Sequence, residues 1–89
     1  MPADTKSLGE ELCERRMALG MSIDDLAREA HISAAYVRAL EERSYHLFPA
    51  KIYAQGAVRS IAHIFSRDDA ESLMAILNRE WPRARGAAD

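Results

Sequence analysis

The side chains best suited to catalysis or metal binding are one cysteine and three histidines, namely Cys13, His31, His46 and His63. A zinc site needs several nitrogen, sulfur or oxygen ligands at short spacings, and a nucleophilic cysteine needs a neighbouring base. The histidines are scattered along the chain, and no glycine-rich phosphate-binding loop accompanies them. We therefore expect no enzymatic activity and no metal or other cofactor. Cys13 is expected to pack, and His31 to make a structural hydrogen bond.

A second kind of chemistry, contact with DNA, could come from residues 33–43. The spacing of the apolar residues Val37 and Leu40 defines the outward positions of this stretch. These positions are Ala34, Ala35, Arg38 and Ala39. Base reading requires side chains such as Arg, Asn or Gln, and each good bidentate pair contributes about 1–3 kcal/mol of discrimination. Only Arg38 could therefore reach a guanine, while Ser33 or Tyr36 could contact a phosphate.

The charge pattern gives little attraction for a phosphate backbone. The basic residues of the central region are Arg28, Arg38, Arg43, Lys51 and Arg59. Acidic residues are interleaved with them: Asp24, Asp25, Glu29, Glu41 and Glu42. If four cations reached phosphates, log K would fall with a slope of about −3.6 against log salt, which is a weak grip for one monomer. DNA contact stays open as an alternative, through Ser33, Ala34, Ala35, Tyr36, Arg38 and Arg43.

Two short predicted helices would position these residues. Ser22, with Asp25 three residues later, forms a capping box, so a helix is expected over 23–30. Ser33 can cap a second helix over 34–43, with Tyr36, Val37 and Leu40 directed inward. Because the link from residue 30 to residue 33 is very short, the two helices must cross steeply. This is the helix-turn-helix arrangement.

A further helix is expected before this pair. Ser7 and Glu10 form another capping box, and Gly20 can end the helix in a left-handed conformation. The inward residues of this helix are expected to be Leu8, Leu12 and Leu19, with Cys13 or Met17. Arg15 and Arg16 are expected on or near its outer side.

Two more helices are expected after a loop over 44–50 that directs Leu47 and Phe48 into the core. The first spans 51–65, with inward residues Ile52, Val58, Ile61, Ala62 and Phe65. Gly56 is expected to mark a close helix contact or an imperfect helix. The second begins at a Ser66 and Asp69 capping box, ends at Trp81 and Pro82, and directs inward Leu73, Met74, Ile76 and Leu77. Residues 82–89 are expected to be a disordered tail.

The whole sequence predicts one compact all-α domain of five helices over 7–81. It has 89 residues, 48% hydrophobic residues, 29% charged residues and a net charge of −2. No window approaches the ~18 apolar residues that a bilayer-spanning helix needs, and residues 1–8 contain no apolar run, so no signal peptide is expected. A single cysteine fits a reducing compartment. We expect a cytoplasmic protein without a membrane segment of its own.

The stretch from Leu8 to Phe65 resembles the Xre and lambda-repressor-like helix-turn-helix domains, and within them the RodZ-type branch. The residues that carry the closer resemblance are Tyr36, Ala39, Leu40, Glu41, Pro49, Tyr53, Gly56, Arg59 and Ser60. Ala57 and Ile61 stand where that branch usually has Phe and Tyr. The resemblance implies the cytoplasmic domain of a membrane-anchored bacterial protein that binds the MreB filament protein and helps maintain cell shape.

Two functions follow as hypotheses. The first is a non-enzymatic interaction module that binds an MreB-like filament protein through Tyr53, Ala57, Arg59 and Ser60. The alternative is a DNA-binding transcriptional regulator of the Xre type.

Overall fold

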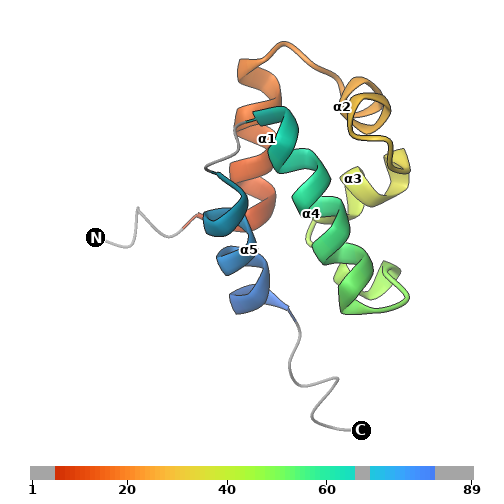
Figure 1. Cartoon of the computed structure of the whole chain (residues 1–89), viewed down its shortest axis with the longest axis vertical. Coiled ribbons are helices and arrows are strands. Elements are labelled where there is room, and N and C mark those ends of the chain that lie inside the picture. The colour runs from red at the N-terminus through yellow and green to blue at the C-terminus, as the bar shows by residue number, and fades with distance from the viewer. Residues whose placement is uncertain (1–5, 66–68, 82–89) are drawn as a thin grey trace, which may run out of the picture.

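The computed structural model describes residues 6–65 and 69–81, and all the regular secondary structure within these ranges is helical (Figure 1). The α-helices are α1 (Leu8–Ala18), α2 (Ile23–Ala30), α3 (Ala34–Glu41), α4 (Lys51–Phe65) and α5 (Asp69–Glu80), with a 3₁₀-helix η2 (Tyr45–Leu47) between α3 and α4. The predicted all-α fold of five helices with a helix-turn-helix is confirmed. The predicted Ser66 cap and the tail over 82–89 lie outside the described residues.

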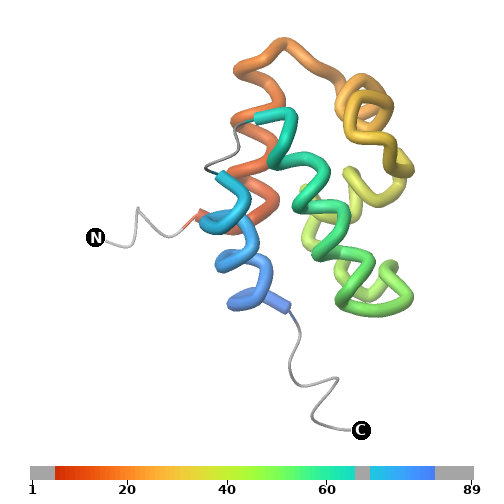
Figure 2. The backbone as a smooth tube through the Cα atoms, in the orientation of Figure 1, coloured from red at the N-terminus to blue at the C-terminus, as the bar shows by residue number. Residues whose placement is uncertain are grey.

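Helix α4 occupies the middle of the domain. It lies between α1 and α5 on one side and α2 and α3 on the other, as Figures 1 and 2 show, and it contacts α5, α2 and α3. Its buried face consists of Ala54, Ala57, Val58, Ile61 and Ala62. None of the helices in the described ranges is long and apolar enough to cross a membrane.

The helix starts follow the predicted caps. Ser7 Oγ accepts a hydrogen bond from the Glu10 N–H at 3.1 Å, and the Glu10 carboxylate accepts one from the Ser7 N–H at 3.0 Å. The Ser22 and Asp25 pair repeats this arrangement at 3.0 and 3.1 Å. Hydrogen bonds from the Ser22 backbone and side chain lower the pKa of the Asp25 carboxyl group. Gly20 has φ 70°, the left-handed conformation that the sequence predicts there.

The core contains most of the large apolar residues that the helical spacing places inward. The largest fully buried side chains are Leu8, Leu12, Leu26, Val37, Leu40, Val58, Ile61, Leu73 and Leu77. Phe48 also enters the core, at 6% exposure. The hydrophobic contacts therefore join all five helices and the loop before α4 into one core.

Four predicted inward residues lie at the surface instead. Leu19 is 52% exposed, because α1 ends at Ala18 and Leu19 follows the helix. Met17 is 65% exposed, Leu47 58% and Ile52 68%. Ile52 lies in the first turn of α4, off the face that runs through Ala54, Val58 and Ile61.

Helices α1 and α3 approach each other closely at Gly9. A Cβ atom added to Gly9 would lie 2.8 Å from the backbone carbonyl carbon of Glu41, and closer still to its oxygen. Only glycine fits here without moving one of the two helices. The predicted close contact at Gly56 is wrong, because nothing lies within 4 Å of a Cβ added there and α4 continues through it.

A largely buried ion pair also joins α1 and α3. Arg16 Nε lies 2.7 Å from Glu41 Oε2, and Arg16 Nη2 lies 3.1 Å from Glu41 Oε1. The two side chains are only 14% and 8% exposed, so the expected outward position of Arg16 is wrong. Arg16 also donates to the Met21 carbonyl oxygen at 2.8 Å. The hydrogen bonds to Glu41 raise the pKa of Arg16, and these bonds hold α3 on α1.

Candidate functional site

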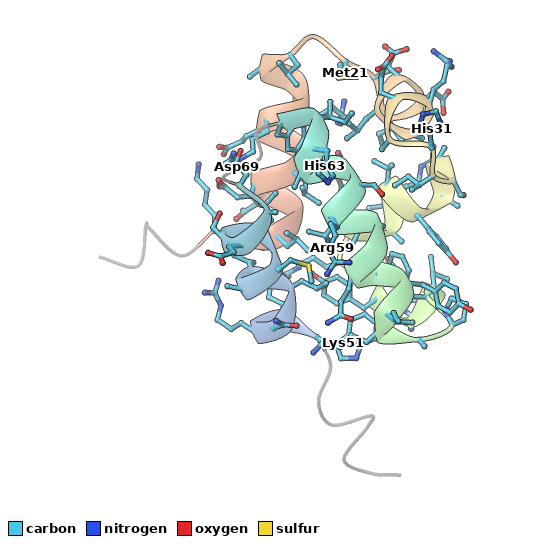
Figure 3. All side chains as sticks on the ribbon, in the orientation of Figure 1. Met21, His31, Lys51, Arg59, His63 and Asp69 are labelled. Atoms are coloured by element: carbon cyan, nitrogen blue, oxygen red, sulfur yellow. The ribbon has the colours of Figure 1, made fainter. Side chains whose placement is uncertain are left out.

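The turn between α2 and α3 has a defined backbone geometry. His31 ends α2 with φ 60°, and its backbone N–H donates to the Arg28 carbonyl oxygen at 3.2 Å. This hydrogen bond comes from the His31 backbone, whereas the His31 side chain, for which a structural hydrogen bond was expected, is exposed, as Figure 3 shows. Ser33 then caps α3, its Oγ accepting from the Ala35 N–H at 3.0 Å. The turn holds α3 against α2 through buried Leu26, Val37 and other core residues.

The predicted DNA-reading positions of α3 are mostly unavailable. Ala39 is 1% exposed, so its predicted outward position is wrong: it packs in the core beside Leu40. Ala34 is half-buried, whereas Ala35 and Arg38 are exposed. Since alanine carries no polar group, Arg38 is the one exposed α3 side chain among these positions that could hydrogen-bond to a base edge.

The residues that flank α3 add little to base reading. Tyr36 is half-buried, with its ring centroid 4.7 Å from that of Phe48, and the Ser33 hydroxyl is engaged in the cap. Arg43 is exposed and has φ 59°, but it lies beyond α3, which ends at Glu41. The predicted extent of this helix, 34–43, is thus two residues too long. The exposed basic groups therefore do not form one continuous reading surface on α3.

The α2 surface is unfavourable for a nucleic-acid backbone. Arg28 is 73% exposed but pairs with Asp25, with 3.4 Å between Nη1 and Oδ1. Asp24 and Glu29 are also exposed on α2. Like charges repel, so these carboxylates oppose the approach of phosphates to α2.

The predicted partner surface on α4 is only partly at the surface. Tyr53 is 51% exposed, Arg59 is exposed and Ser60 is half-buried. Ala57 is 2% exposed, so its predicted role in a partner surface is wrong. It lies one turn from both Ala54 and Ile61 on the buried face of α4, and therefore packs in the core.

Exposed apolar side chains gather where the chain enters α4. Three of the five exposed large hydrophobic residues in the described ranges are Leu47, Ile52 and Tyr53, which we call the α4-entry patch. Tyr53 was predicted from the sequence as part of a partner surface, whereas Leu47 and Ile52 were predicted to lie in the core. The helical spacing could have predicted the exposure of Ile52, because Ile52 does not share a face with Ala54, Val58 and Ile61.

Helix α4 differs from the rest of this acidic chain in its charges. Between Lys51 and Phe65 it contains no aspartate or glutamate, while it carries Lys51, Arg59 and His63. Arg59 and His63 are exposed, and Figure 3 shows both on the outer side of α4. The side of α4 that continues from the α4-entry patch is therefore neutral to basic.

The described residues provide no constellation for catalysis or metal binding. No group of three His, Cys, Asp or Glu residues within 6–65 and 69–81 could hold a metal ion. Cys13 is partly exposed, with its Sγ 3.7 Å from Met17 Sδ and 3.6 Å from Arg16 Nη2. A polar groove of about 430 Å³ is lined by Ser7, Glu10, Glu41, Arg43, Arg79 and Glu80. Three of its charged groups, Glu10, Glu41 and Glu80, make the helix contacts described above and below.

Comparison with known proteins agrees with the architecture. The family model described as a helix-turn-helix domain matches residues 11–72, which cover most of α1, the α2 and α3 pair, α4 and the start of α5. No curated protein and no solved structure gives a significant match to the chain.

Proposed function

The chain belongs to the helix-turn-helix domain family, and from that premise we propose that it is a non-enzymatic module that binds a protein partner through the α4-entry patch and the outer side of α4. The observation that carries this proposal is the exposure of Leu47, Ile52 and Tyr53, three large apolar side chains within residues 47–53. Contiguous exposed apolar residues on a small domain are typical of protein interfaces. Aromatic anchors such as Tyr53 often dominate the binding energy of these interfaces.

The partner that we propose is an MreB-like cytoskeletal filament protein, which the RodZ-like sequence features imply. This assigns the domain to the cytoplasm and to the maintenance of cell shape. Arg59 is exposed two turns after Ile52 along α4, so we propose that the partner carries a carboxylate opposite it. The electrostatic attraction speeds the encounter and orients the two proteins, while the apolar residues supply most of the affinity.

Capture of a purified MreB-like filament protein in a co-sedimentation assay tests this proposal. Tyr53→Ala is expected to weaken capture about 10-fold or more, because it removes a large exposed aromatic anchor. Arg59→Ala is expected to weaken it about 3-fold and to reduce the dependence of capture on salt. Both residues are exposed, so the thermal midpoint should change little.

Leu19→Ala provides the matched control. Leu19 is exposed to the same degree as Tyr53, at 52% against 51%, but it directly follows α1. The C-terminal end of α1 lies away from the start of α4 (Figure 2). Its removal should leave capture unchanged. Capture that is insensitive to Tyr53→Ala and Arg59→Ala would exclude α4 from the interface.

DNA binding as an Xre-type regulator is the second candidate. The exposure of Arg38 on α3 and of Arg43 just beyond it favours this function, since both could contact DNA if α3 entered the major groove. The buried position of Ala39 and the carboxylates of α2 count against it. The two candidates make opposite predictions for binding to random duplex DNA.

A further inference from the structure

The loop before α4 presents one member of the α4-entry patch through two buried anchors. In η2 and the residue after it, Tyr45 and Phe48 are 5% and 6% exposed, whereas Leu47 is 58% exposed. Side chains three residues apart lie on the same side of a 3₁₀-helix, so Tyr45 and Phe48 point inward together. Leu47 consequently faces outward. The exposure of Leu47 thus depends on how firmly the two anchors are held.

The last two described residues of the α5 region hold both anchors. The Tyr45 hydroxyl donates to Glu80 Oε1 at 2.8 Å. The Trp81 ring centroid lies 5.6 Å from that of Tyr45 and 6.5 Å from that of Phe48. These spacings are typical of interacting aromatic pairs. Glu80 lies 35 positions from Tyr45 in the sequence, and Trp81 lies 33 positions from Phe48. These distant residues therefore fix the orientation of the loop.

Glu80 also connects this loop to the start of α1. Its Oε2 and Oε1 atoms accept from the Leu8 N–H at 3.2 and 3.3 Å. Burial, and then the hydrogen bond to Glu80, raise the pKa of Tyr45, so its hydroxyl remains a neutral donor at physiological pH. A single carboxylate consequently joins the first helix, the last helix and the loop before α4.

We infer that Glu80 and Trp81 are positioning residues for the α4-entry patch: they hold Tyr45 and Phe48, and so preset Leu47 for a protein partner. This inference rests on the function proposed above. A loop fixed in its bound conformation loses less entropy on binding. Because coupling between two sites is reciprocal, partner binding at Leu47 should in turn tighten the packing of Trp81.

Trp81→Ala, Glu80→Gln and the control Leu73→Ala distinguish positioning from general stabilisation. Leu73 is a fully buried α5 residue, so Leu73→Ala is expected to lower the thermal midpoint without acting on the loop. Trp81→Ala should weaken the affinity of the folded domain for a purified MreB-like filament protein about 3- to 10-fold. Glu80→Gln keeps an acceptor for Tyr45 and should have a smaller effect. Leu73→Ala should leave the affinity of the folded domain unchanged.

Amide hydrogen exchange without a partner gives a second measurement that does not depend on the proposed function. Trp81→Ala should accelerate exchange selectively in residues 44–50, by about 10-fold. If Trp81→Ala and Leu73→Ala accelerate exchange with the same distribution along the chain, or lower affinity equally, the positioning role is overturned. If the wild-type domain does not bind the filament protein, the proposed function fails. The exchange measurement still tests the positioning role: faster exchange confined to residues 44–50 in Trp81→Ala supports it, and uniformly faster exchange overturns it.

Discussion

Leu40→Ala is expected to lower the free energy of unfolding by about 2–5 kcal/mol, the range found for leucine truncations that leave a buried cavity. Leu40 has no exposed surface and lies on α3, which contacts α1, α2 and α4. Backbone on several sides cannot easily collapse into the vacated volume. Urea unfolding followed by circular dichroism measures the loss, with the slope of the transition as a check on cooperative unfolding.

Leu47→Ala is the matched control for this truncation. It removes the same atoms from a side chain that is 58% exposed, so we expect a change within about 0.5 kcal/mol. A loss below about 1 kcal/mol for Leu40→Ala would contradict the placement of α3 in the centre of the core.

Gly9→Ala is expected to destabilise the domain by about 2 kcal/mol, although alanine is the better helix former. The added methyl group would overlap the Glu41 carbonyl, and overpacking of this kind typically costs about 1–3 kcal/mol. The obstacle is backbone, so α1 and α3 must separate. Their separation would also stretch the ion pair between Arg16 and Glu41. Thermal or urea unfolding measures the effect.

The same substitution at Gly56 should have the opposite sign. Gly56 lies inside α4 with nothing within 4 Å of an added Cβ, so Gly56→Ala should stabilise the domain by about 0.5–1 kcal/mol through helix propensity. Comparing the two glycine-to-alanine substitutions thus distinguishes the effect of helix packing on stability from the effect of helix propensity. Equal effects at both positions would contradict the close approach of α1 and α3.

Local signals in the sequence were sufficient for most of the fold. The two capping boxes at Ser7 and Ser22 and the left-handed Gly20 depend on residues within a few positions of each other, and each was predicted. Large apolar residues at helical spacing, such as Leu26 and Leu40, were also placed correctly. These features are determined by the backbone of one helix and its own periodic face.

The errors concern features that depend on neighbouring helices. Ala39 and Ala57 were placed at the surface, since alanine suits either face of a helix, yet both are buried where another helix approaches. The close contact predicted at Gly56 is absent, and the one at Gly9 was not predicted, because it depends on a carbonyl 32 residues away. No local pattern contains that information.

In the candidate site, too, some residues were predicted from the sequence, whereas the contacts between distant residues were not. Tyr53 and Arg59 were identified from the sequence and are exposed. Leu47 and Ile52 were missed because hydrophobic residues at helix ends are usually assigned to the core. The hydrogen bond from Tyr45 to Glu80 and the ring contacts of Trp81 join residues more than 30 positions apart, so they required the structure.

The most direct test of the central claim, that α2 and α3 form a scaffold rather than a DNA reader, is the affinity of the domain for random duplex DNA. Fluorescence anisotropy from about 50 to about 200 mM salt measures this affinity and its salt dependence. With Arg38 as the one exposed polar α3 side chain among the reading positions and with carboxylates on α2, we expect no measurable binding even at the lowest salt concentration. Tight binding that weakens steeply with salt would contradict the claim and favour the DNA-binding function.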